Sequence, residues 1–185
     1  QPRDGARRVT LYVAPTSAGV ATVACLAPPA DAGAFKAECD GIANTLRLGG
    51  DATAFPVGPD PAYAKTLEKT FAALDRGVTR GQRALGRDGA TFRAQAAAAR
   101  GIGGAYADAA RRLRQAETSP ADEAINALLV KRLREVSTAW KRAASEAADK
   151  DKRGFARSER GIRRAQQQLA QAVAGLEAAG YSVSA

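Results

Sequence analysis

Residues 119–144 read SPADEAINALLVKRLREVSTAWKRAA, and this stretch decides the fold. Ser119, Pro120 and Asp122 approximate a capping box with proline at the first helical position. Apolar side chains then recur at steps of three and four residues, which is the spacing of one face of an α-helix. They are Leu129, Leu133, Val136, Trp140 and Ala144. The stretch therefore predicts a long helix with one buried face, and its lone tryptophan is expected in the core.

Three more segments show apolar residues at steps of seven. The first follows the Asp60-Pro61 cap and ends before Gly86, the second covers Phe92 to Leu113, and the third covers Phe155 to Leu176 with Gly180 as its C-cap. Heptad spacing in four long segments with short joints is typical of helices that pack side by side. Residues 59–185 are therefore predicted to form an antiparallel four-helix bundle.

Residues 1–58 show shorter periods. Residues 8–14 and 19–26 alternate between apolar and polar side chains, which predicts two strands. A helix is expected from Asp31 to about Leu48, and residues 52–57 are expected to form a short edge strand limited by Pro56. The apolar face of that helix is Phe35, Cys39, Ile42 and Leu46. The tail, residues 181–183, alternates as well and is expected to extend the same sheet. The predicted class is mainly α (α+β).

Charge is divided unevenly along the chain. The 28 Lys and Arg residues outnumber the 19 Asp and Glu residues, which gives a net charge of +9. Residues 1–58 contain five of each sign, so residues 59–185 carry the whole excess of 23 − 14 = +9. This difference supports two sub-structures with boundaries at 1–58 and 59–185.

Cys25 and Cys39 are the only cysteines, and histidine is absent. The missing histidine removes the commonest general base and metal ligand, and two cysteines without CxxC spacing disfavour zinc, so we expect no metal and no cofactor. A disulfide between them is predicted, and it would place the chain in an oxidising, extracytoplasmic compartment. The alternative is a pair of buried free thiols.

Catalysis and membrane spanning both lack a sequence signal. A Ser–His–Asp set is impossible without histidine, and the carboxylates are scattered among basic neighbours. Residues 11–30 carry no charge, but their three prolines and few large aliphatic residues argue against a spanning helix. Because the chain opens at Gln1, we expect it to be trimmed from a longer protein whose membrane tether lies outside this chain.

A stripe of arginines is the strongest candidate for a binding surface. Arg153, Arg157, Arg160 and Arg164 step by four, three and four residues along the last predicted helix. One interpretation is a patch for an anionic partner, and the other is a solvated outer face. Nucleic acid is disfavoured because no aromatic residue accompanies the stripe. Gly101, Gly103 and Gly104 lie within a predicted helix, so close packing or a kink is favoured over a phosphate loop.

Four segments also resemble a known kind of receptor. They are GVATVACLAPP, AECDGIANTLRL, VGPDPAYAKTLEKTFAAL and LEAAGYSV. In this order they are similar to the region beyond the transmembrane helix of some actinobacterial receptor-type serine/threonine protein kinases. The resemblance covers most of the chain and implies an extracellular sensor domain of a single-pass membrane protein. Only Cys25 and Cys39 match as particular residues, and no kinase catalytic motif occurs.

Two functions are therefore expected. The first is an extracytoplasmic sensor or interaction domain, non-catalytic in itself, with an unknown extracellular ligand or protein partner and a capacity for self-association. The second is a basic helical module that binds a polyanion, such as a cell-wall polymer, anionic lipid or nucleic acid.

Overall fold

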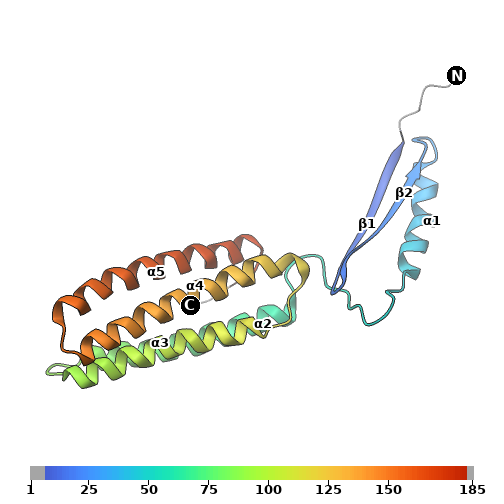
Figure 1. Ribbon diagram of the computed structural model, residues 1–185. Coiled ribbons are helices and arrows are strands. Elements are labelled where there is room, and N and C mark those ends of the chain that lie inside the picture. Colours follow the sequence, from blue (N-terminus) through green and yellow to red (C-terminus); the bar gives the residue numbers. More distant parts are fainter. Residues whose placement is uncertain (1–6, 183–185) are drawn as a thin grey trace. The chain divides into compact units, whose positions relative to one another are not determined.

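The computed structural model describes residues 7–182, which form five helices and one two-stranded antiparallel sheet (Figure 1). The elements are β1 (Arg8–Thr16), β2 (Gly19–Ala27), α1 (Ala32–Thr45), α2 (Pro61–Leu85), α3 (Phe92–Arg114), α4 (Pro120–Ala148) and α5 (Lys152–Ala178). The prediction of a mainly helical chain with a small sheet and a Cys25–Cys39 disulfide is confirmed.

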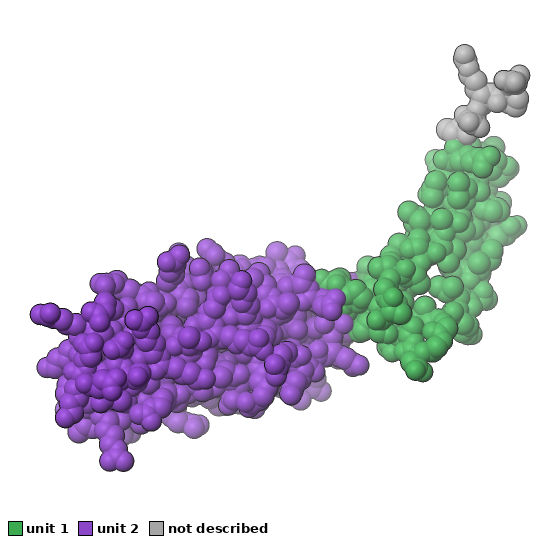
Figure 2. Space-filling view, viewed as in Figure 1, with its two compact units in different colours: residues 1–57, 119–121 green, residues 58–118, 122–185 purple. Residues whose placement is uncertain are grey.

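The chain divides into two compact units, which Figure 2 colours separately. We call residues 1–57 with 119–121 the hairpin unit, and residues 58–118 with 122–185 the helical unit.

In the hairpin unit, β1 and β2 pair in register from Arg8 opposite Ala27 to Thr16 opposite Gly19. A two-residue turn joins the strands. Gly19, the first residue after the turn, has φ +129°, a conformation that residues with a side chain rarely adopt. Helix α1 lies against one face of the hairpin and is tied to it by the disulfide, whose Cα atoms are 6.4 Å apart. The sulfur link therefore fixes α1 to the sheet.

Two predictions for the hairpin unit are wrong. Residues 52–57 form no strand, only an isolated bridge between Ala54 and Thr16, because Pro56 has no N–H to continue the pairing. Helix α1 ends at Thr45 rather than Leu48, and its expected apolar face is mostly outside: Cys39 is 1% exposed but Ile42 is 59% exposed. A sheet of two strands is too narrow to cover that face.

In the helical unit, α2 to α5 contribute to one hydrophobic core. The five side chains of α4 that were predicted to be buried are all buried, and Trp140 is one of them. Helices α3 and α4 approach closely at Gly103 of α3, where an added Cβ would lie 3.2 Å from the Ser137 carbonyl oxygen of α4. The Ser137 hydroxyl donates to the Gly103 carbonyl at 2.7 Å. Close packing is therefore the role of this glycine, whereas Gly101 and Gly104 meet open space.

Tyr181 and Ser182, the described residues of the tail, do not join the sheet, which corrects the prediction for them. Gly180 has φ +91°, and the N–H groups of Gly180 and Tyr181 donate to the carbonyls of Glu177 and Leu176, a Schellman ending. This turn places Tyr181 in the core of the helical unit, where its ring meets Tyr63 edge to face at 5.3 Å between centroids. Val183 lies outside the described residues.

Candidate functional site

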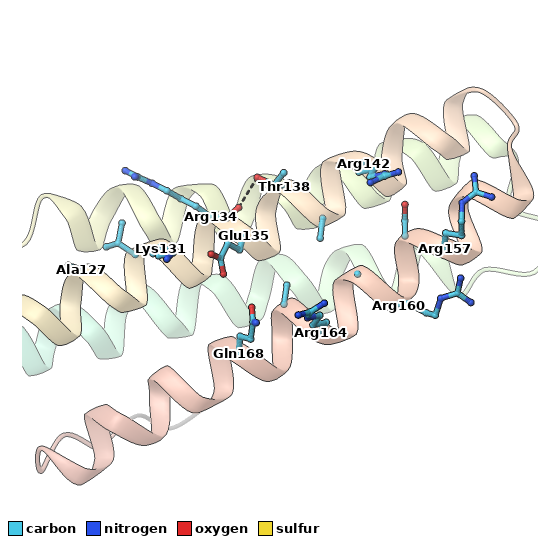
Figure 3. A pocket seen from close by; sticks show the side chains of 15 residues that line it. Ala127, Lys131, Arg134, Glu135, Thr138, Arg142, Arg157, Arg160, Arg164 and Gln168 are labelled. Atoms are coloured by element: carbon cyan, nitrogen blue, oxygen red, sulfur yellow. Dashed lines mark hydrogen bonds between the residues drawn. The ribbon is translucent and has the colours of Figure 1, made fainter.

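A groove of about 830 Å³ lies between α4 and α5 (Figure 3). Helix α4 contributes Ala127, Val130, Lys131, Arg134, Glu135, Thr138, Ala139 and Arg142 to its lining, and α5 contributes Arg157, Ser158, Arg160, Gly161, Arg164, Ala165 and Gln168. The volume lies within the range of sites for small ligands, about 300–1,000 Å³. The groove is therefore the first candidate for a binding site.

The structure places three of the four predicted stripe residues on this groove. Arg157, Arg160 and Arg164 line it, because steps of three and four residues keep them on one face of α5. Arg153 belongs to the first turn of the same helix and does not line the groove. The stripe is therefore one rim of the groove for most of its length.

The opposite rim is also cationic, and sequence reasoning missed it. Lys131, Arg134 and Arg142 of α4 line the groove, and Figure 3 shows all three on α4, with the Arg134 side chain extending away from α5. The basic residues of α4 are visible in the sequence as part of its polar face. Nothing in their spacing indicates that this face borders the arginine stripe, because that depends on how α4 and α5 pack.

The groove carries a large excess of positive charge. Six basic residues and one carboxylate line it, which gives 6 − 1 = +5. The carboxylate, Glu135, is already engaged by Arg132, whose Nη1 lies 2.8 Å from its Oε2. Within residues 7–182, four of the six cations form no ion pair: Lys131, Arg134, Arg160 and Arg164. All six cationic residues are exposed, so their charges are accessible to an anionic occupant.

Between the rims, the groove is lined with small and apolar residues. Val130 and Ala165 are buried, and an added Cβ at Gly161 would meet nothing within 4 Å. Ser158 is 6% exposed, and its hydroxyl has no hydrogen-bond partner among the described residues. A buried polar atom without a partner is unusual, so this hydroxyl is a second indication of a ligand.

The joint between the two helices fixes one end of the groove. Asp151 caps α5 by accepting from the Gly154 N–H at 2.8 Å. That hydrogen bond, followed by the charge of Arg157, holds the pKa of the Asp151 carboxyl below its usual value. At the other end, Arg132 Nη1 of α4 lies 3.3 Å from Gln168 Oε1 of α5. Both ends of the groove are therefore held by contacts between residues of α4, α5 and their joint.

A second cavity of about 510 Å³ lies between α2 and α3. It has basic side chains as well, but Asp108 on its lining forms an ion pair with Arg111 at 2.8 Å, and no buried polar atom without a partner lines it. The α4–α5 groove is the stronger candidate.

Three further features of the chain are its capacity to hold a metal ion, its redox environment and its capacity to span a membrane. The described residues contain no group of three or more His, Cys, Asp or Glu side chains placed to hold a metal ion. The Cys25–Cys39 disulfide favours an oxidising, extracytoplasmic environment. Among residues 7–182, no helix combines the length and the apolar character needed to cross a membrane.

Comparison with known proteins gives no further assignment. No protein-family model, no curated protein and no solved structure matches the chain.

Proposed function

We propose that this chain is a non-catalytic, extracytoplasmic binding domain whose helical unit holds an anionic ligand in the α4–α5 groove. In this proposal α2 to α5 form an antiparallel four-helix bundle, and the groove runs between its last two helices. The single observation that carries the proposal is the convergence of six cations from two helices on one groove whose only carboxylate is already paired.

A sensor role for the parent protein is the second part of the proposal. The disulfide supports an extracytoplasmic place, and the resemblance to receptor-kinase extracellular regions supports a membrane-anchored parent, such as a serine/threonine protein kinase. Occupation of the groove would bring α4 and α5 into a fixed arrangement, which is a change that an attached module can detect. Catalysis has no part in this mechanism.

Charge reversal on the groove tests the proposal. Arg160→Glu/Arg164→Glu should weaken binding of inorganic polyphosphate, measured by titration calorimetry, because two unpaired cations of the groove become anions. The wild-type affinity should also fall with rising salt. The slope of the logarithm of the binding constant against the logarithm of the salt concentration should be shallower by about 1.4 in the variant, because each lost phosphate contact contributes roughly 0.7 for a single-stranded polyanion.

The matched control is Arg93→Glu/Arg100→Glu on α3. These arginines are exposed and line none of the described cavities, and their reversal changes the net charge by the same amount. The control should bind nearly as well as the wild type. Equal weakening by the two double variants would show that net charge alone attracts the polymer, and the proposed site would be wrong.

A further inference from the structure

We propose, building on the groove function above, that the groove seats one flexible, linear phosphate polymer whose charges are separated by carbon spacers. A polyol phosphate has this chemistry. The charges, the small side chains and the hydrogen-bonding groups along the groove point to this ligand class.

The charges run the whole length of the groove rather than gathering at one end. On α4, Lys131 and Arg142 are eleven residues apart, which is about 16 Å of helix, and on α5 the step from Arg157 to Arg164 covers about 10 Å. The contact between Arg132 and Gln168 marks the end near Lys131, whereas Arg157 belongs to the end near the α4–α5 joint. A ligand with a single charged head would leave most of these cations without a partner.

The spacing of the rim cations indicates the spacing of the ligand charges. Arg157, Arg160 and Arg164 rise by about 4.5 Å and about 6 Å along the helix axis. An extended chain that follows this rim therefore meets a cation once every few backbone atoms. Phosphates joined through short carbon units match that pattern, and the guanidinium groups suit phosphate because they bind it through two parallel hydrogen bonds.

The lining between the rims favours a slender chain without bases. Ala139, Gly161 and Ala165 present only small groups, and the open space over Gly161 lets a chain approach the α5 backbone. Aliphatic spacers match this apolar surface. No Phe, Tyr or Trp lines the groove, so the stacking that nucleic-acid sites use is missing there.

The buried hydroxyl of Ser158 provides a direct hydrogen bond to such a ligand. It lines the groove, and its oxygen has no partner among the described residues. A hydroxyl donates and accepts, so a phosphate oxygen or a polyol hydroxyl would satisfy it. Ser158 is therefore inferred to be a specificity residue, in contrast to the rim arginines, which attract any anion.

The test fills the groove without changing its charge. Gly161→Leu should weaken binding of poly(glycerol phosphate) by about tenfold or more, measured by calorimetry, because the leucine side chain occupies the space of the chain. The Cβ meets nothing within 4 Å, so the helix tolerates the change. Gly101→Leu on α3 is the matched control, since its Cβ also meets nothing, and it should bind as the wild type does.

Ser158→Ala gives a second readout that a structural role would not produce. Removing a buried hydroxyl without a partner should leave the melting temperature of the free protein unchanged or higher, while poly(glycerol phosphate) binds more weakly. A lower melting temperature together with unchanged binding would show that the hydroxyl supports the fold instead, and its role in the groove would be wrong.

The variants distinguish a polymer seated in the groove from an anion bound only at its rims. If Arg160→Glu/Arg164→Glu weakens binding but Gly161→Leu does not, the ligand lies on the rims and the seated-chain inference is overturned, while anion binding stands. Tighter binding of dodecyl phosphate or of oligothymidylate than of poly(glycerol phosphate) would overturn it too, in favour of a single-headed amphiphile or a nucleic acid. Tighter binding of inorganic polyphosphate would overturn the need for carbon spacers.

Discussion

The hairpin unit and the helical unit are stabilised in different ways. Within residues 7–57 only Thr16, Ala27 and Cys39 are buried, so the hairpin unit has almost no core, and the disulfide joins its layers. The helical unit has no disulfide, but its four helices share a core that includes Leu113, Leu129 and Leu133, all fully buried. A segment too small to bury apolar surface needs a covalent link, whereas long amphipathic helices do not.

The same difference extends to the surfaces of the two units. One face of the hairpin presents half-exposed aliphatic side chains and carries no charge; they are Val9, Leu11, Val13, Val20 and Leu26. The helical unit buries most of its aliphatic residues and exposes arginines, five of which border the α4–α5 groove together with Lys131. The units therefore differ in what they offer a partner: one an apolar sheet face, the other a cationic groove.

Leucine-to-alanine substitutions should show the largest difference in stability cost between the two units. Leu133→Ala should destabilise the helical unit by about 2–5 kcal/mol, because Leu133 is 0% exposed in a packed core. Leu11→Ala should cost the hairpin unit less than about 0.5 kcal/mol, because Leu11 is 60% exposed. Hydrogen exchange resolved by residue measures both, and equal costs would mean that the hairpin face is covered in solution.

Removing the disulfide should affect only the hairpin unit. Cys25→Ser/Cys39→Ser should destabilise that unit by about 3 kcal/mol, since the bond closes a loop with a sequence separation of 14. Amides of β1, β2 and α1 should then lose protection from exchange. The fluorescence of Trp140, the only tryptophan, reports on the helical unit, and its urea midpoint should stay unchanged.

Reduction of the wild-type protein is the control for that pair of substitutions, and it should reproduce the same loss of protection. A shift of the Trp140 transition in either experiment would show that the two units unfold together, and the contrast between them would have to be given up.

High pH should destabilise the helical unit by a smaller amount. Burial, and then the hydrogen bond that its hydroxyl donates to Asp122, raise the pKa of Tyr181 to about 12. The unfolded chain ionises near the ordinary value of 10, so stability is full below pH 10 and falls as the pH rises towards 12. The loss due to Tyr181 should be roughly 1–2 kcal/mol, followed by Trp140 fluorescence during urea unfolding.

Tyr181→Phe separates this effect from general alkaline unfolding. The variant is less stable at neutral pH, because it lacks the hydroxyl that binds Asp122 and accepts from the Asp60 N–H at 2.9 Å. It should nevertheless lose less stability between pH 10 and 12, although Tyr63, whose pKa is also raised by burial, still contributes. An identical alkaline loss in both proteins would exclude Tyr181 as the cause.

Much of the secondary structure was predictable, because its signals are local. Asp60 accepts from the N–H groups of Ala62 and Tyr63 at the start of α2, and the helix begins at Pro61 as the sequence indicates. The apolar face of α4 was predicted residue by residue, since a period of 3.6 needs no information from elsewhere in the chain.

Predictions that depended on how one element packs against another were less successful. The apolar face of α1 was expected inside, but Ile42 and Leu46 are exposed, because burial depends on the width of the sheet as well as on periodicity. Tyr181 was assigned to the sheet from its alternating pattern, yet the turn at Gly180 places it in the helical core. The spacing of Arg157, Arg160 and Arg164 predicted that they share one face of α5, but neither the groove nor its α4 side was predicted.

The sequence by itself determined the mainly helical class, the starts of α2 and α4 and the identity of the disulfide partners, because two cysteines allow one pairing and helix caps act within a single turn. Only the tertiary structure decided that the polar faces of α4 and α5 border the same groove, with Ser158 buried in its lining. The physical reason is that periodicity reveals which side of a helix faces the core. Which polar side chains then meet depends on the packing of core residues far apart in the sequence, such as Leu133 and Ile162.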